Sequence, residues 1–232
     1  MILTGVEWQI VALSLKVSAA AMAATLPIAF ALAWVLARKR FVGKVLLDAL
    51  VHLPLVLPPV VTGWLLLLAF GANGPLGRLL ASAFGTSVMF RWTGAAVAAA
   101  IMALPLMVRA IRLSIEAVDP RLESAARTLG AGPWRTFFEI TMPLALPGVL
   151  AAMVLGFARS IGEFGATITF VSNIPGETRT LPLAIYTALQ APGGEATATR
   201  LAVISVALSL IALVASEALA RRGNAARAGH VL

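Results

Sequence analysis

Two ionisable residues stand inside an otherwise apolar run, and this is where the chain most clearly carries chemistry. The run Arg159-Ser-Ile-Gly-Glu163-Phe-Gly-Ala-Thr167 places opposite charges four residues apart. On a helix, residues i and i+4 share a face, so Arg159 and Glu163 are expected to pair, directed into the protein interior. Two interpretations stay open. The pair is a neutralised structural element, or with Ser160 and Thr167 it lines a route for a polar solute, since small and hydroxyl residues also serve helix packing in membranes.

A second informative stretch is amphipathic and lies between strongly apolar segments. Asp119 is a good helix N-cap and Pro120 fits the first turn, while Gly130 suits a left-handed C-terminal cap. Four apolar residues recur at i, i+3, i+4 and i+7: Leu122, Ala125, Ala126 and Leu129. This pattern predicts a helix with one apolar stripe. The stripe either packs on its own domain or, because the paired alanines let a backbone seat closely in a groove, meets a soluble partner.

The composition is that of an integral membrane protein. Of 232 residues, 60% are hydrophobic and 12% are charged, which is far from a soluble composition. The absence of cysteine excludes disulfides and thiolate metal sites, and the two lone histidines, His52 and His230, do not make a metal-ligand cluster. We therefore predict no metal site. The chain has a net charge of +8, and a basic surplus of this kind is typical of membrane proteins, whose cytoplasmic loops carry it. We therefore expect no nucleic-acid partner.

The elements that must position these residues are membrane-spanning helices. Five apolar segments are long enough to cross a bilayer, at about 8–36, 45–70, 92–108, 144–171 and 201–219. Within the first, we expect Lys16 either to extend toward one interface or to belong to an amphipathic start of the helix. Pro54, Pro58 and Pro59 must break or kink the second, either to shape a polar path or only for packing. We predict an all-α, polytopic membrane protein, residues 1–232 forming one domain, with a short helix around 76–84 in a loop.

The positions of the basic residues predict the orientation. Five spans put the termini on opposite sides, and one arrangement collects twelve of the eighteen Lys and Arg residues on one side: Arg38, Lys39, Arg40, Lys44, Arg109, Arg112, Arg121, Arg127, Arg135, Arg221, Arg222 and Arg227. By the positive-inside rule this side is cytoplasmic. The N-terminus and the 172–198 loop are then external, and the C-terminus is cytoplasmic.

The amphipathic stretch resembles the EAA loop of ABC-transporter permeases, whose pattern reads Glu-Ala-Ala-x-x-x-Gly-x9-Ile-x-Leu-Pro. Five residues match in register: Ala125, Ala126, Gly130, Ile140 and Pro143. Ser124 stands where the family usually has Glu, with Glu123 one residue earlier, and Met142 replaces Leu. The resemblance implies a cytoplasmic coupling loop, about 112–143, that contacts an ATPase. The implied contact residues are these five matches and Glu123.

The run from Arg159 to Pro182 is similar to the sulfate and molybdate branch of these permeases, and its Ser-Asn-Ile-Pro-Gly-Glu-Thr segment is most similar to the molybdate permeases. This resemblance implies a type I ABC importer permease in the cell inner membrane. The implied assembly is a homodimer with two copies of a cytoplasmic ATPase and an external molybdate-binding protein, surrounded by membrane lipid. The chain lacks G-x-x-x-x-G-K-[ST], so ATP and Mg would be used by the ATPase, and this chain would bind no cofactor.

Other functions remain to be weighed against this one. The same branch includes permeases for sulfate or tungstate, and physical reasoning from the sequence does not separate these tetrahedral dianions. A self-sufficient channel or secondary carrier fits the hydropathy but gives no reason for an amphipathic docking helix. An intramembrane enzyme with Glu163 as its catalytic group lacks a Ser/His pair, an HExxH run or paired aspartates. We therefore predict a transporter subunit without catalytic residues.

Overall fold

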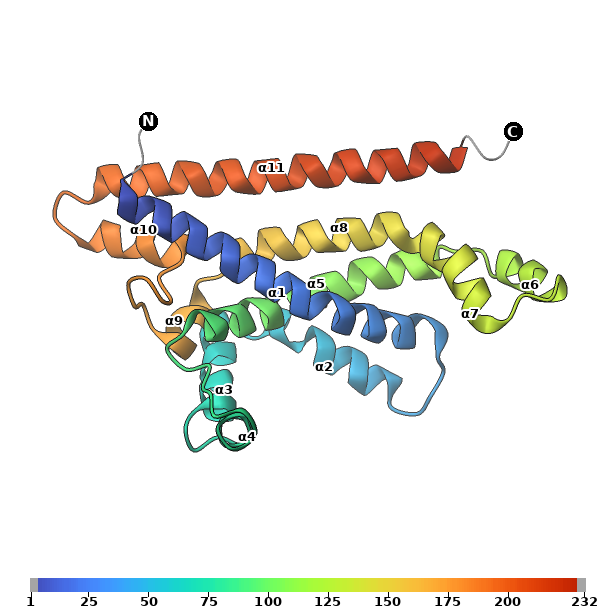
Figure 1. Cartoon of the computed structure of the whole chain (residues 1–232), viewed down its shortest axis with the longest axis horizontal. Coiled ribbons are helices and arrows are strands. Elements are labelled where there is room, and N and C mark those ends of the chain that lie inside the picture. Colours follow the sequence, from blue (N-terminus) through green and yellow to red (C-terminus); the bar gives the residue numbers. More distant parts are fainter. Residues whose placement is uncertain (1–3, 229–232) are drawn as a thin grey trace.

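The chain folds into a bundle of long helices in a computed structural model that describes residues 4–228 (Figure 1). In order, its elements are α1 (Gly5–Arg38), α2 (Lys44–Val56), α3 (Pro59–Phe70), α4 (Pro75–Phe84), α5 (Trp92–Glu116), α6 (Pro120–Thr128), α7 (Pro133–Thr136), the π-helical segment η1 (Phe137–Thr141), α8 (Met142–Ile161), α9 (Gly165–Val171), α10 (Leu181–Gln190) and α11 (Glu195–Ala228). His230 and the two chain ends lie outside the described residues.

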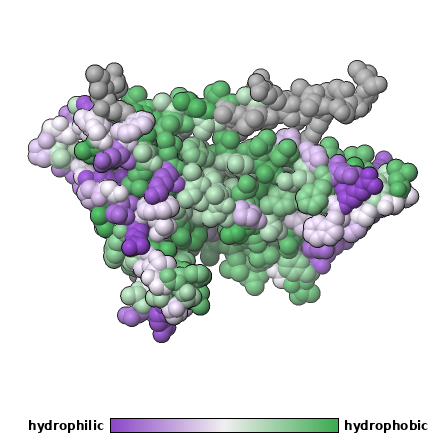
Figure 2. All heavy atoms as spheres, in the orientation of Figure 1, coloured by the Kyte–Doolittle hydropathy of each residue, from purple (hydrophilic) through white to green (hydrophobic). Residues whose placement is uncertain are grey.

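Four helices could cross a membrane by themselves, and the number reaches the five expected spans when one bent helix pair is counted as a span. Four helical stretches are long and apolar enough by themselves: Gly5–Arg38, Trp92–Glu116, Pro133–Ile161 and Glu195–Val214. The fifth is the pair α2 and α3, which bend by 115° at the proline-containing break between them. Hydrophobic residues cover the middle of the molecule and hydrophilic ones gather toward its two ends (Figure 2). The predicted all-helical membrane fold is confirmed.

The core forms where α5 packs between α1 and α8. Small side chains dominate these contacts, and Ala29 and Ala33 of α1 and Ala98 and Ala103 of α5 are fully buried. In lipid, helices associate through close packing rather than through a hydrophobic driving force, and alanine lets two backbones approach. The alanine-rich composition of these helices thus explains their tight association.

The segments that were expected on opposite sides of the membrane lie at opposite ends of the bundle (Figure 1). The start of α1, the loop after α9 and helix α10 lie at one end. The loop between α1 and α2, helix α6 and the last turns of α11 lie at the other end. The segments that share most of the basic residues therefore share one end of the molecule.

Lys16 has a partner that the sequence did not indicate. Its Nζ lies 3.8 Å from the centroid of the Trp92 ring, at the start of α5. A cation over an aromatic face is attracted by the ring quadrupole. This contact holds Lys16 beside Trp92 and joins α1 to α5.

Two segments differ from the sequence-based expectation. Residues 181–190, expected as part of an external loop, form α10, because Leu181 and Leu183 are fully buried and the Leu181 N–H donates to Ser14 Oγ at 2.7 Å. The expected span 144–171 is not one helix. It breaks at Gly162–Phe164, so Arg159 lies on α8 and Thr167 on the separate helix α9.

Candidate functional site

The predicted docking helix exists as α6, and its two caps are those that the sequence indicated. Asp119 is the N-cap, and its Oδ1 accepts a hydrogen bond from the Arg121 N–H at 2.9 Å. Gly130 has φ +85°, a left-handed conformation that glycine adopts without strain. The Gly130 N–H donates to the Arg127 carbonyl and the Ala131 N–H to the Ala126 carbonyl, both at 3.0 Å. This pair of bonds is a Schellman motif, so α6 ends sharply and holds a defined shape.

The apolar stripe of α6 faces an open groove. A cavity of about 540 Å³ lies between α6 and the segment from η1 to the start of α8. Four of the six proposed coupling residues line it: Ala125, Ala126, Ile140 and Pro143. Leu122 and Leu129 border the same groove while remaining 48% and 89% exposed. Large apolar side chains left exposed beside a groove are typical of surfaces that bind another protein.

Glu123 does not line this groove. Its Oε1 accepts hydrogen bonds from Arg38 Nη2 at 2.6 Å and from Thr141 Oγ1 at 2.7 Å, and only 14% of its side chain is exposed. One carboxylate therefore ties α6 to α1 and to η1. The structure separates Glu123 from Ala125, Ala126, Ile140 and Pro143, whereas Gly130 lies at the end of the helix as its cap.

The Arg159–Glu163 pair predicted from the i, i+4 spacing is present. Arg159 Nη1 lies 2.6 Å from Glu163 Oε2, and the Glu163 side chain is 2% exposed. Glu163 lies in the break after α8, where its second oxygen, Oε1, accepts from the Ala166 N–H at 2.8 Å. The carboxylate thus closes the end of α8 with one oxygen and caps the first turn of α9 with the other. That capping role could not be seen while 144–171 was treated as one helix.

The break between α8 and α9 touches the break between α2 and α3. A Cβ built on Gly165 would lie 2.7 Å from Pro59 Cβ, and one built on Gly63 would lie 2.6 Å from the Ala166 carbonyl oxygen. Glycine at both positions therefore permits a backbone approach that any side chain would prevent. Two interrupted helices meet here, next to the buried ion pair.

Hydroxyl groups near this crossing are buried without partners. Ser160 Oγ at the end of α8 and Thr62 Oγ1 at the start of α3 have no hydrogen-bond partner among the described residues. Thr167 is 2% exposed on α9. A buried hydroxyl without a partner is costly, so such groups call for a ligand, a water or a conformational change that satisfies them. Of the four proposed path residues, Arg159, Ser160 and Glu163 cluster at the end of α8, and Thr167 lies across the break.

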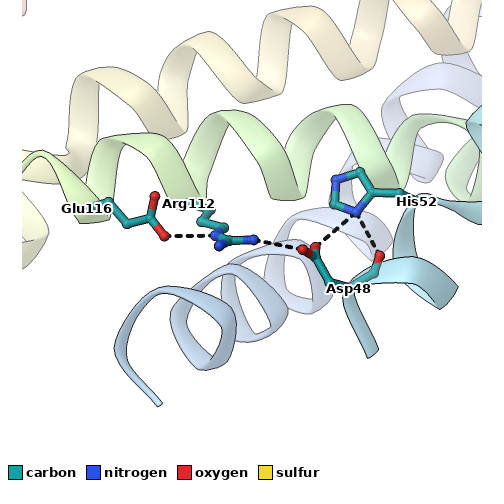
Figure 3. A network of polar contacts seen from close by, with 4 residues as sticks. All are labelled: Asp48, His52, Arg112 and Glu116. Atoms are coloured by element: carbon teal, nitrogen blue, oxygen red, sulfur yellow. Dashed lines mark hydrogen bonds and ion pairs between the residues drawn. The ribbon is translucent and has the colours of Figure 1, made fainter. Parts of the chain in front are cut away.

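A second polar cluster was missed by reasoning from sequence (Figure 3). Arg112 of α5 contacts Glu116 Oε1 through Nε at 2.8 Å and Asp48 Oδ2 of α2 through Nη1 at 3.1 Å. His52 Nδ1 lies 3.2 Å from Asp48 Oδ1. The i, i+4 spacing of Asp48 with His52 and of Arg112 with Glu116 was available as a signal. What the sequence could not supply was the contact that joins the two pairs and holds α2 against α5.

No metal centre is found in the part of the chain that the structure describes, where no three His, Cys, Asp or Glu residues come together in a suitable arrangement.

The family model that matches this chain is that of the binding-protein-dependent transport system inner membrane component, and it covers residues 8–224. The chain belongs to this family. A molybdenum transport system permease protein, ModB, of Escherichia coli strain K12 is 62% identical over 221 residues, which are 95% of this chain and 96% of the relative. ModB of Haemophilus influenzae is 59% identical over 210 residues, with 90% and 92% of the two chains covered.

Solved structures agree on the fold. A chain from a bacterial alginate ABC transporter, crystallised with a periplasmic protein that holds an alginate pentasaccharide, matches with a TM-score of 0.73 at 17% identity, over 92% of this chain and 78% of that chain. A chain of the MetNI methionine ABC transporter in an inward-facing conformation matches with a TM-score of 0.65 at 17% identity, over 94% of each chain. The protein is thus a type I ABC importer permease in fold, an integral membrane protein of a family of transporter subunits.

Proposed function

We propose that this protein is the membrane-spanning subunit of an ATP-driven importer that moves molybdate across the cytoplasmic membrane. The observation that carries the proposal is the 62% identity to a molybdenum permease over 95% of the chain. In the proposed assembly, two copies of this chain form a homodimer, two copies of an ATPase hydrolyse ATP with Mg, and an external binding protein delivers the oxyanion. All of residues 1–232 then act as one permease domain.

The geometry of α6 supports a coupling role for the 112–143 segment. The helix is capped firmly at both ends, and its apolar stripe borders an open groove lined by Ala125 and Ala126. A rigid helix with small side chains can seat in a partner and transmit displacement rather than bend. Because Glu123 of α6 binds Arg38 of α1, a displacement of α6 would be transmitted directly to a membrane-spanning helix.

The meeting of the two interrupted helices supports a translocation role for the region around Arg159, Ser160, Glu163 and Thr167. Non-helical backbone inside a membrane is tolerated where it is enclosed in protein or lines a polar cavity. The fixed charges of Arg159 and Glu163 and the unpartnered Ser160 hydroxyl lie at such a break. In the path interpretation these groups shape the field along the route of a dianion, and in the structural interpretation they only hold the break together.

The orientation belongs to the same proposal. With the basic end of the bundle facing the cytoplasm, α6 meets the ATPase, and the loop after α9 meets the external binding protein. The start of α1 is then external and the end of α11 cytoplasmic.

Uptake by reconstituted transporter tests the proposal. Liposomes should contain this chain with its ATPase, and the external solution should contain the binding protein with molybdate, tungstate or sulfate. We expect ATP-dependent accumulation of molybdate that requires the binding protein. A sulfate permease of Escherichia coli, CysT, is 39% identical over 86% of this chain, so sulfate is the relevant competitor. Accumulation of sulfate in place of molybdate would overturn the substrate, and uptake without an ATPase would overturn the mechanism.

A further inference from the structure

An aromatic groove runs along the surface of α1 where this helix approaches its basic end. The groove has a volume of about 590 Å³ and is bordered by Phe30, Trp34, Trp134 and Phe137, with Lys39 at its edge. Phe137 of η1 lies against both α1 aromatics, with ring centroids 6.0 Å from Phe30 and 4.9 Å from Trp34. Trp134 remains 75% exposed. The groove is therefore built from ordered aromatic rings but is open to its surroundings.

A second, polar cavity adjoins the aromatic groove. It has a volume of about 380 Å³ and shares Trp34, Lys39 and Phe137 with the first one. Its additional lining includes Arg38, Glu123 and Arg127. We call these two adjoining surface cavities, which share Trp34, Lys39 and Phe137, the channel; it is distinct from any translocation path. The first cavity is its aromatic part and the second is its charged part.

The charged part carries a surplus of positive charge. Arg38 is neutralised by Glu123 at 2.6 Å. Lys39 and Arg127 form no ion pair with any residue that the structure describes, and both are exposed. Two unneutralised cations therefore face a cavity whose one carboxylate is already occupied.

The position of the channel indicates where its occupant comes from. Phe30 and Trp34 lie one turn apart in α1, a helix long and apolar enough to cross the membrane, and the helix ends at Arg38. Tryptophan is enriched where hydrocarbon meets the headgroup region, and basic pockets between membrane helices bind lipid headgroups. We therefore expect the aromatic part to lie toward the hydrocarbon and the cationic part toward the headgroups.

We propose that this channel binds an anionic phospholipid of the surrounding leaflet, its acyl chain along Phe30, Trp34 and Phe137 and its phosphate at Lys39 and Arg127. An apolar chain fits the aromatic groove, and a negative headgroup complements the two free cations. Neither a free anion nor an uncharged lipid satisfies both parts. Only the name of the leaflet, cytoplasmic, rests on the proposed function.

The site also borders the residues that hold the docking helix. Arg127 belongs to α6, and Glu123, which ties α6 to α1, lines the same cavity. A bound headgroup would therefore connect α1 and α6 at a second point beside the Arg38–Glu123 pair. Occupancy should stabilise the position of α6 relative to α1.

Binding can be measured on the purified full-length chain in detergent, without ATPase or transport. Native mass spectrometry and thermal unfolding would compare phosphatidylglycerol with phosphatidylcholine of identical acyl chains. We expect a saturable preference for phosphatidylglycerol and a matching rise in Tm. The double variant Lys39→Ala with Arg127→Ala should lower the affinity for phosphatidylglycerol by roughly tenfold or more. Each cation near a membrane surface contributes up to about a factor of ten in affinity, and the variant removes two.

Two further variants separate the parts of the site. Arg40→Ala removes an exposed cation next to Lys39 that does not line the channel, so its lipid preference should equal that of the wild type. Trp134→Ala opens the aromatic part, so it should weaken binding of both lipids. Thermal unfolding without lipid shows whether each variant is folded.

Equal binding of the two lipids by the wild type, or an unchanged lipid preference in the double variant, would overturn the proposal. So would a loss of preference in Arg40→Ala as large as that in the double variant. Full reproduction of the Tm shift by glycerol 3-phosphate, which has no acyl chain, would also overturn it. Release of the lipid when a second copy or the ATPase binds would assign the channel to that protein instead. Failure of molybdate uptake would leave these lipid measurements unaffected, so the two proposals can fail separately.

Discussion

Arg38 Nη2 and Glu123 Oε1 lie 2.6 Å apart although 85 positions separate the two residues in the chain. The pair joins the end of α1 to the docking helix α6, and Thr141 adds a third contact from η1. The side chains are only 20% and 14% exposed, so the pair is screened by water much less than a surface pair. It is a direct polar connection between α6 and a helix long and apolar enough to cross the membrane.

Replacing Glu123 should lower the free energy of unfolding more than replacing a carboxylate of an exposed ion pair. Glu123→Ala leaves Arg38 largely buried without its counter-charge and should lower the free energy of unfolding by about 2 kcal/mol. Glu139→Ala breaks the i, i+4 pair with Arg135, whose side chains are 57% and 69% exposed, and should cost less than about 0.5 kcal/mol. Thermal or denaturant unfolding in one detergent measures both. Equal losses would show that Glu123 does not fasten α6.

Overfilling the stripe of α6 should uncouple ATP hydrolysis from uptake. Ala125 lines the groove, so Ala125→Arg places a long charged side chain in the proposed contact. We expect a folded membrane subunit with at least about a tenfold loss of coupled uptake, because a loss of 1.4 kcal/mol or more in docking corresponds to that factor. Ser124→Arg is the matched control, since Ser124 is an exposed residue of the same helix that does not line the groove. Similar uptake by the two variants would contradict the docking assignment.

The cap at Gly130 offers a second test of the same helix. Gly130 has φ +85°, which a β-branched residue adopts only with strain, so Gly130→Val should disturb the end of α6. We expect reduced coupling with little loss of membrane insertion, as judged by uptake per folded transporter. Full coupling in this variant would mean that the sharp end of α6 is dispensable.

The orientation can be tested because the chain has no cysteine of its own. A cysteine at position 176 should react with a membrane-impermeant reagent added from outside, and one at position 131 should react only after the membrane is opened. Both positions lie in loops, Gly176 exposed and Ala131 partly exposed. The loop after α9 and the segment after α6 are at opposite ends of the bundle (Figure 1). The reverse labelling pattern would invert the proposed topology.

The ion pair at the break between α8 and α9 distinguishes a structural role from a path role. Arg159→Met alone leaves Glu163, which is 2% exposed, without its cation and should cost a few kcal/mol under either interpretation. The informative protein is the double variant Arg159→Met with Glu163→Gln. It removes both charges but retains an oxygen that can accept from the Ala166 N–H.

We expect the double variant to assemble and to bind its ATPase, yet to lose most molybdate uptake, because the fixed charges lie beside unpartnered hydroxyl groups at the helix break. Unfolding and ATPase binding are the controls for assembly. Uptake at the wild-type rate in a stable double variant would return Arg159 and Glu163 to a purely structural role.

Local chemistry was sufficient to predict α6 and the Arg159–Glu163 pair. Asp119, Pro120 and Gly130 act through neighbours within a few residues, so their roles as caps follow from sequence spacing alone. The Arg159–Glu163 pair also depends only on a separation of four residues. The two side chains stay in contact even though α8 ends between them. Apart from the break within 144–171, the hydrophobic spans and the proline break after α2 were predictable for the same reason, since each depends on a continuous stretch of chain.

Tertiary structure alone decided which distant segments meet. No local rule could indicate that Glu123 binds Arg38, that Arg112 reaches Asp48, or that Gly63 and Gly165 bring two helix breaks together. Hydropathy treated 144–171 as one span because it averages over the residues near Gly162, where a packed neighbour and the Glu163 carboxylate stabilise a break. The sequence by itself therefore determined most of the apolar helices, the caps of α6 and the resemblance to a family. Packing between helices determined the contacts among them and the break at Gly162–Phe164, because these depend on geometry that sequence spacing does not contain.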